Sequence, residues 1–400
     1  MNQGPMTASR IVLFCLLFWA YIEPAMESMA AEWSLDPSIG VRGEYNTNLL
    51  ITHLDHEAVW GTWVSPGIKF AGTTERLEIS GKASLDFVRY TGGQDEEFTN
   101  VFLPLSARYK TEHDTFGFDG GYTRDNTLMG ELLTTGMLIR FTQRNLWTAS
   151  PTWTRELTEQ LSFQVGYQFT NASYENGRRL GLLDYELHGG TAALIYQASE
   201  RTKVQVLGNY LRFETKGVPL QASAPGAALS LTHSFSESLT VTAAGGPRVI
   251  TTSFQSSSVG LKDSETVWTY NASILKQFEH SGIQIGYSRD IFPSGFGLLI
   301  RNDQVSAIVS TTLSHSLTAA LDARYNWVTG QTTTALGGRL PDATFIHLSP
   351  KLTWRINEWW SLESSYTYRT FDAETFSNAG HSHSTQLMLT WHPTKLTISR

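Results

Sequence analysis

Charge, cysteine and long apolar runs are all scarce in this chain of 400 residues. Only 17% of the residues are charged, and the formal net charge is −7 with a pI near 5.9. A nucleic-acid partner requires a basic surface, so this class of function is excluded. The one cysteine, Cys15, allows neither a disulfide within the chain nor a zinc–thiolate site. Beyond residue 22 no stretch reaches the roughly 20 apolar residues of a transmembrane helix, which excludes a multi-pass helical membrane protein.

The first thirty residues have the order of a secretory signal peptide. Arg10 precedes an apolar run over 11–22, and small residues follow up to Ala31. A charged start, an apolar middle and a small-residue cleavage site are typical of such signals. We therefore predict a signal peptide over residues 1–30 and a single exported domain over 31–400. An uncleaved anchor helix is the alternative, although the apolar run is short for it.

From residue 36 onward, apolar and polar residues alternate. In the segment 161–170 the odd positions are Leu, Phe, Val, Tyr and Phe, whereas the even positions are Ser, Gln, Gly, Gln and Thr. The segments 317–327 and 77–87 repeat the pattern. Period-two alternation predicts strands with one apolar and one polar face. At about ten to fifteen residues, these strands are longer than soluble ones and long enough to cross a bilayer.

The breaks between the predicted strands alternate between short turns and longer polar or glycine-rich loops. The short turns fall at 73–76, 111–114, 156–160, 199–202, 234–238, 279–282, 313–316 and 357–358. The longer loops fall at 46–57, 91–97, 127–140, 174–184, 214–223, 256–265, 293–302, 330–342 and 372–384. This order predicts an all-β fold: a single transmembrane antiparallel up-and-down β-barrel of about 18 strands (16–18), with short periplasmic turns and long extracellular loops. In lipid, only a closed sheet pairs all of its backbone N–H and C=O groups. The alternative is a soluble β-sandwich, which would have shorter strands.

Several short motifs connect the chain to a known family. They include Gly-Val-Arg-Gly-Glu-Tyr-Asn-Thr-Asn at 40–48, Ser-Pro-Gly at 65–67 and tyrosine-rich strands such as 166–169. In these motifs the exported chain resembles a family of Gram-negative outer-membrane β-barrel porins associated with exopolysaccharide biosynthesis. The resemblance implies a barrel in outer-membrane lipid, inserted by the barrel-assembly machinery, and a role in polysaccharide export. Such barrels commonly end on an aromatic residue, whereas this chain ends at Arg400, so Trp391 is the candidate to close the last strand.

Charge and width of the lumen set the selectivity of a channel. Alternation assigns nearly equal numbers of basic and acidic residues to the lumen, which favours a weakly selective pore or a neutral substrate over a dedicated conduit for a polyanion. Alternatively, any one of these charged residues forms an ion pair that stabilises the barrel wall. The lumen-facing candidates are Arg42, Glu44, Lys82, Asp86, Arg108, Asp119, Glu186, Asp322, Arg324, Glu363 and Arg369, together with Lys69, Glu78, Lys203 and Lys351.

The predicted loop 127–140 is unusually apolar for the outer rim of a barrel. Exposed apolar surface is unfavourable in water, so we expect the loop either to fold inward as a constriction or to meet a partner. A strand extension or packing against neighbouring loops is the alternative. The constriction candidates are Leu128, Met129, Leu132, Leu133 and Met137.

The sequence contains little that indicates catalysis. His381 and His383 flank Ser382 in a predicted polar loop, where solvated histidines are commoner than a metal site. No Gly-x-Ser-x-Gly element is present. We therefore predict no enzyme activity, cofactor or metal. The predicted function is a passive pore for polysaccharide export or small-solute diffusion; a plugged structural or adhesive barrel, and then an outer-membrane hydrolase, are the alternatives.

Overall fold

A computed structural model of the chain describes residues 32–93, 95–135, 141–255, 260–329, 332–333, 338–339, 341–375 and 377–399. The predicted signal peptide and Met137 lie outside the described residues. None of the described helices is long and apolar enough to cross a membrane.

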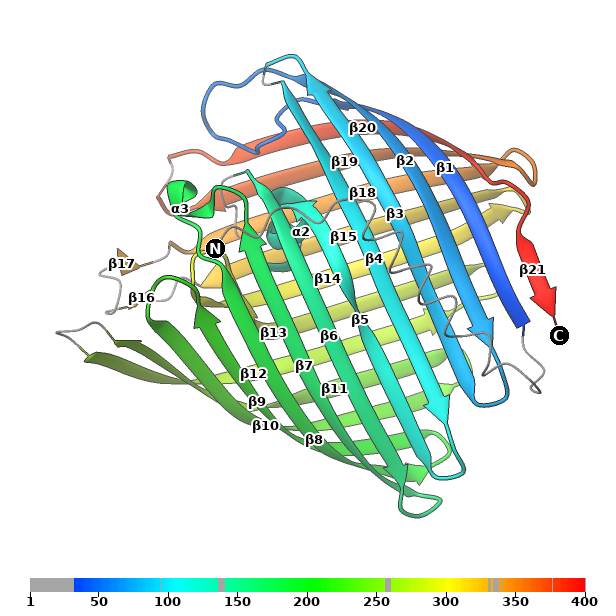
Figure 1. Ribbon diagram of the computed structural model, residues 1–400, viewed down its shortest axis with the longest axis vertical. Helices are drawn as coiled ribbons and strands as arrows, with labels where there is room; N and C mark the ends of the chain where they lie inside the picture. Colours follow the sequence, from blue (N-terminus) through cyan, green and yellow to red (C-terminus); the bar gives the residue numbers. More distant parts are fainter. Residues whose placement is uncertain are drawn as a thin grey trace, which may run out of the picture.

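Eighteen long strands form one closed antiparallel sheet (Figure 1). Each pairs with its neighbours in sequence, and β1 pairs with both β2 and β20, which closes the barrel. The predicted single up-and-down barrel of 18 strands is confirmed. The strands are β1 (Glu32–Asn46), β2 (Val59–Thr73), β3 (Leu77–Thr91), β4 (Glu96–Lys110), β5 (Asp114–Asn126), β6 (Gln143–Glu156), β7 (Leu161–Tyr174), β8 (Tyr185–Ser199), β9 (Thr202–Thr215), β10 (Leu220–Ser236), β11 (Leu239–Gln255), β12 (Gly260–Gln277), β13 (Ser281–Pro293), β14 (Leu299–Ser314), β15 (Leu317–Thr329), β18 (Ala343–Arg355), β19 (Trp360–Ala373) and β20 (Gly380–Trp391).

The remaining elements are short. The strand β21 (Leu396–Ser399) follows β20 after a break and pairs with the first residues of β1, so the last strand of the barrel is divided in two. The helices are α2 (Thr127–Thr135) and α3 (Gly177–Leu180), and a small separate hairpin consists of β16 (Thr332–Thr333) and β17 (Gly338–Arg339).

The two rims of the barrel differ in the length of their connections. On one rim, the connections from β2 to β3, from β4 to β5 and so on to that from β18 to β19 contain two to four residues. Residue Glu32 of β1 and Ser399 of β21 are paired at this short-turn rim. On the opposite rim, which we call the long-loop rim, the connections range from four residues between β3 and β4 to sixteen between β5 and β6.

The outer face carries a belt of exposed apolar and aromatic side chains. In β1, for example, Leu35, Ile39 and Val41 are exposed, whereas Gly40 and Glu44 on the alternate face are buried. The same alternation continues around the wall from strand to strand. An exposed apolar belt of this extent is unfavourable in water and matches the lipid-facing surface of a transmembrane barrel.

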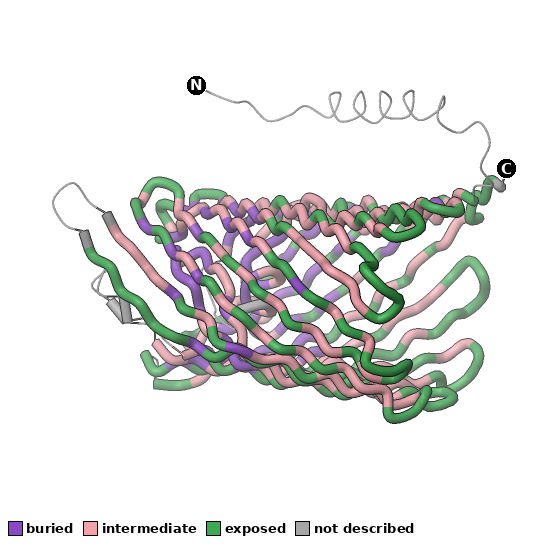
Figure 2. Tube along the Cα trace, turned by 90° about the horizontal axis from the view of Figure 1, so that it is seen from below, coloured by how far each residue is buried: buried purple, intermediate pink, exposed green. Residues whose placement is uncertain are grey.

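Near the long-loop rim, apolar side chains lie on the inner face beside buried polar ones. Buried residues gather toward that end of the barrel (Figure 2). One cluster, which includes Leu187, Phe213 and Ile250, lies among β7–β14. Two further clusters enclose α2 and the loop between β1 and β2. Loops folded into the mouth supply the apolar partners here, so the rule of apolar residues outside and polar residues inside fails at this end.

Candidate functional site

The helix α2 forms inside the long connection between β5 and β6. Asn126 caps its N-terminus, because the Asn126 Oδ1 accepts a hydrogen bond from the backbone N–H of Met129 at 3.0 Å. The backbone N–H of Thr127 donates to the carbonyl oxygen of Thr142 at 3.0 Å, which closes the base of the loop. Leu128 and Leu132 lie four residues apart and therefore share one face of the helix.

This leucine face packs onto a part of the wall that is distant from β5. Leu132 is fully buried, and with Leu128 it joins a cluster that includes Ile300 of β14, Phe345 of β18 and Phe371 of β19. The helix starts from β5 and contacts β14, which is nine strands away in a barrel of eighteen. It therefore reaches across the lumen to the opposite wall.

The constriction candidates take part in this packing to different degrees. Leu128 and Leu132 are buried, and Leu133 packs against the same cluster from a partly buried position. Met129 packs instead against a second cluster on β2–β4, which contains Trp63 and Tyr90. These apolar residues of the loop are thus directed into the barrel.

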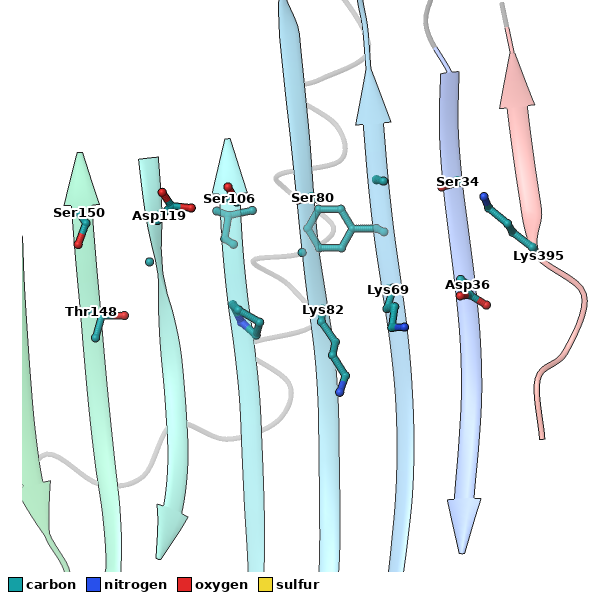
Figure 3. A pocket seen from close by; sticks show the side chains of 16 residues that line it. Ser34, Asp36, Lys69, Ser80, Lys82, Ser106, Asp119, Thr148, Ser150 and Lys395 are labelled. Atoms are coloured by element: carbon teal, nitrogen blue, oxygen red, sulfur yellow. The ribbon is translucent and has the colours of Figure 1, made fainter. Parts of the chain in front are cut away.

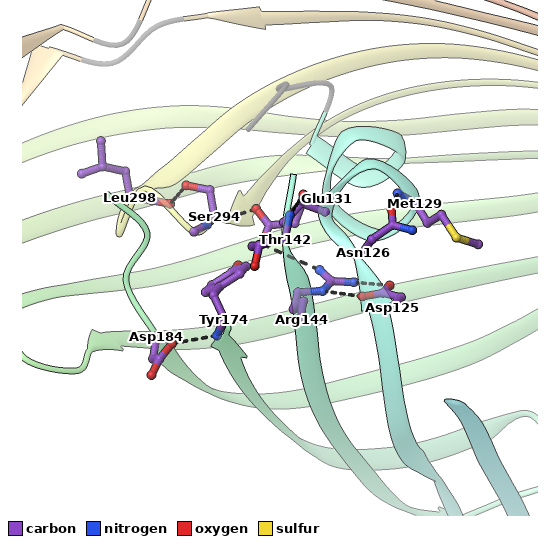
Figure 4. Close-up of polar contacts among 12 residues, drawn as sticks. Asp125, Asn126, Met129, Glu131, Thr142, Arg144, Tyr174, Asp184, Ser294 and Leu298 are labelled. Carbon is purple, nitrogen blue, oxygen red and sulfur yellow. Dashed lines mark hydrogen bonds and ion pairs between the residues drawn. The ribbon is translucent and has the colours of Figure 1, made fainter. Parts of the chain in front are cut away.

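A buried polar network ties α2 to the wall (Figure 4). Arg144 of β6 donates two hydrogen bonds to Asp125 of β5, at 3.0 Å from Nε and 2.8 Å from Nη2. The Oε1 of Glu131 in α2 lies 3.9 Å from Nη1 of the same arginine. Its Oε2 accepts a hydrogen bond from the backbone N–H of Gly295, in the loop between β13 and β14, at 3.1 Å.

A cavity of about 460 Å³ remains between α2 and the inner wall. Its wall comes from the consecutive strands β14, β15, β18–β20 and β1–β4, and Leu128 and Met129 of α2 cover it. Several of the predicted lumen residues line this cavity, although they are far apart in sequence. They are Arg42, Glu44, Asp322, Lys351, Glu363 and Arg369.

All three carboxylates of this set already have partners. Glu44 accepts hydrogen bonds from the hydroxyls of Tyr90 at 3.0 Å and Ser384 at 2.8 Å. Asp322 receives two hydrogen bonds from Arg324, at 3.0 Å and 2.8 Å. Glu363 forms an ion pair with Lys351 at 3.4 Å. The acceptors of the cavity wall are therefore largely satisfied within the protein.

The arginines of the cavity are less fully engaged. Arg42 stacks on the ring of Trp63 and donates one hydrogen bond to Gln386 at 3.4 Å, but its Nε has no partner within the described part of the chain. The same holds for the buried Nε of Arg369 and Nδ1 of His347. These three nitrogen atoms are themselves buried, whereas the side chains that carry them line the cavity.

A second hollow, of about 710 Å³, lies nearer the short-turn rim (Figure 3). Lys69 of β2 and Lys82 of β3 face each other directly in the register of the two strands. Like charges in this position destabilise a sheet. Asp119 of β5, another predicted lumen residue, and the hydroxyls of Ser80 and Ser106 lie along the same wall.

Several other predicted lumen residues, among them Asp86 and Arg108, lie outside these two hollows. Asp86 of β3 is on the same face as Lys82, four residues along the strand. Arg108 of β4 lies near the short-turn rim, opposite Glu78 in the register. Both positions are on the inner face.

Glu186 is not on the inner face, contrary to the prediction. It is paired in register with Asn171, accepts a hydrogen bond from the Asn171 Nδ2 at 2.7 Å, and forms an ion pair with Lys216 at 2.8 Å. Its neighbour Leu187 takes the inner position because it belongs to the apolar cluster under the loops. The apolar interior at the long-loop rim reverses the pattern from which the prediction was made.

His381 and His383 also differ from their predicted setting. They lie in β20 rather than in a loop, on the exposed face. Their Nδ1 atoms make hydrogen bonds with the hydroxyls of Tyr368 at 3.2 Å and Tyr366 at 2.7 Å. Within the described ranges no group of three or more His, Cys, Asp and Glu side chains is placed to hold a metal ion.

Several site residues were not predicted from the sequence. Trp63, Tyr90, Asp125 and His347 all line the cavity or anchor α2. Each lies an even number of residues from a predicted lumen position on its own strand, as Asp125 does from Asp119. Extending the alternation along each strand, instead of selecting charged residues in its middle, would have found them.

Comparison with known proteins gave solved structures only, since no protein-family model and no curated protein matches the chain. One similar structure is OccK7 (OpdD) of Pseudomonas aeruginosa, with a TM-score of 0.47, 10% identity, and coverage of 93% of this chain and 100% of that one. OccAB4 of Acinetobacter baumannii gives a TM-score of 0.45 at 10% identity over 92% and 99% of the two chains. OpdK of Pseudomonas aeruginosa, determined with vanillate, gives the same values.

Proposed function

We propose that this protein is an integral outer-membrane β-barrel that acts as a passive pore for small solutes. The observation that carries the proposal is the position of α2, which crosses the lumen and still leaves the cavity of about 460 Å³ beside it. Barrels of 16 to 18 strands enclose an aqueous channel rather than a packed core. The apolar belt on the outer face supplies the membrane-facing surface that such a pore needs.

The cavity favours solutes that carry a carboxylate or a similar group rich in acceptors. The carboxylates of the wall are bonded to protein groups, whereas the guanidinium groups of Arg42 and Arg369 line the cavity and form no ion pair among the described residues. Guanidinium groups bind carboxylates with strong, directional hydrogen bonds. The near balance of formal charge in the lumen therefore understates the preference for anions.

Polysaccharide export is the alternative that the sequence resemblance implies. It requires a lumen wide enough for an extended polymer, while α2 lies across this one. A plugged structural or adhesive barrel is the other alternative, and it would require the cavity beside α2 to be closed at both ends.

Reconstitution of the purified full chain in planar bilayers tests the proposal. We expect stepwise ionic conductance, together with swelling of proteoliposomes in small sugars and small carboxylates but not in a polysaccharide of several kilodaltons. Persistent electrical silence of correctly folded protein would favour the plugged barrel. Polysaccharide permeation at a rate similar to that of small solutes would favour export.

A further inference from the structure

The network that anchors α2 places two carboxyl groups beside one guanidinium group. The side chains of Asp125, Glu131 and Arg144 are 6%, 2% and 8% exposed. Arg144 directs its two short hydrogen bonds to Asp125. When Glu131 is also ionised, these three side chains carry a net charge of −1 in a nearly water-free place, which is unfavourable.

Glu131 is the only one of these three groups that belongs to the helix. Its Oε1 faces Arg144 of β6 at 3.9 Å, and its Oε2 accepts the Gly295 N–H of the loop between β13 and β14 at 3.1 Å. This carboxyl group therefore connects α2 to two regions of the wall. Tyr185 of β8, which is buried, is a further titratable group that interacts with it.

Burial raises the pKa of Glu131 to about 7, well above its usual value of 4.5. Asp125 adds to the rise, while Arg144 and the hydrogen bond from Gly295 oppose it. A carboxyl group with a raised pKa stabilises the docked helix fully below pH 4.5, and this contribution is lost as the pH rises through about 7.

We propose that Glu131 is a pH-sensitive latch: the protonated carboxyl keeps α2 docked across the lumen, and loss of the proton favours release of the helix and a wider pore. From the two pKa values, the docking equilibrium should weaken about thirtyfold between about pH 5.5 and about pH 8.5. The predicted change in pore width rests on the proposed function as a pore. The predicted pH dependence of α2 docking does not depend on that function.

The test compares the full-length protein with two variants, Glu131→Gln and Glu57→Gln. The amide introduced by Glu131→Gln would imitate the protonated carboxyl at every pH. Glu57 is an exposed residue of the loop between β1 and β2, which makes it the matched control. We would record single-channel conductance in planar bilayers over the same pH range. In parallel, hydrogen exchange of residues 127–135 would be measured by mass spectrometry and corrected for the intrinsic pH dependence of exchange.

We expect the wild type and Glu57→Gln to show more frequent large-conductance openings and weaker protection of α2 as the pH rises from about 5.5 to about 7, with little further change above that. Glu131→Gln should keep small openings and a protected helix throughout. The latch is refuted if the corrected protection of α2 in the wild type is independent of pH, or if Glu131→Gln retains the wild-type transition. Silent bilayers would contradict the proposed pore alone, because hydrogen exchange still decides whether the latch exists.

Discussion

Arg42 and Trp63 face each other in the register of β1 and β2, with the guanidinium carbon 3.3 Å from the centroid of the ring. The contact is a cation–π interaction on the inner face of the barrel, beside the helix that crosses the lumen. It holds a long, flexible side chain in one place. An arginine held in this way loses little further entropy when it binds a passing solute.

Removal of this cation is expected to change ion selectivity. Arg42→Gln and Arg369→Gln should each lower the anion-to-cation permeability ratio by about twofold to fivefold, since lumen charge sets selectivity. The reversal potential in a salt gradient measures this ratio. Arg108→Gln, near the short-turn rim and outside the cavity, is the control; an equal effect of all three variants would place the selective region elsewhere.

Deletion of residues 129–137 removes most of α2 from the lumen. We expect single-channel conductance to increase while the heat-resistant folded form persists in detergent electrophoresis, because the wall strand β5 ends at Asn126 and β6 begins at Gln143. Conductance at the parental value would show that α2 does not limit the pore.

Gly130→Ala tests the packing between α2 and the wall with a single methyl group. A Cβ at this position would collide with the Arg144 guanidinium and the Asp125 carboxylate, which are buried and paired. We expect the helix to be displaced and the conductance to rise toward that of the deletion. At Gly190 of β8 an added Cβ meets nothing within 4 Å, so Gly190→Ala is the matched control and should conduct like the wild type.

Adjacent residues of a wall strand face lipid and lumen in turn, so substitutions at neighbouring positions should differ in their cost to folding. Leu321 of β15 lies on the outer face and Asp322 on the inner face, where it is paired with Arg324. Leu321→Arg near the middle of the bilayer should cost about 2–4 kcal/mol of folding free energy, whereas Asp322→Asn should have a small effect. Urea unfolding in liposomes measures both. Similar costs at the two positions would contradict the assigned register.

Labelling provides a second, independent check of the register in β7. Gln164 donates a hydrogen bond to Thr154 on the inner face, and Phe163 packs edge-on against Trp153 on the outer face. Gln164→Cys should therefore react with a water-soluble thiol reagent in proteoliposomes, and Phe163→Cys should be protected by lipid. Equal reactivity of the two cysteines would show that the faces are wrongly assigned.

Two wrong predictions show where reasoning from alternation ends. Glu186 lies on the outer face and His381 lies in a strand, and both are near the long-loop rim. In the middle of the bilayer, lipid outside and water inside impose one rule on every strand. At the long-loop rim, loops fold into the mouth of the barrel and water reaches the outer face. The polarity of a residue there does not predict whether its side chain lies on the inner or the outer face.

The sequence by itself determined the barrel, its eighteen strands and the inward position of residues such as Arg42 and Asp322, because a closed sheet in lipid forces period-two alternation along every strand. Only the tertiary structure decided that Leu128 and Leu132 of α2 rest on strands half-way around the wall, and that Glu131 meets Arg144 and Gly295 there. The contacts of α2 with β14 and with Gly295 join segments more than a hundred residues apart through side-chain packing inside the lumen. No local periodicity in the chain records such a contact, which is why the sequence left an inward-folded loop as one of several alternatives.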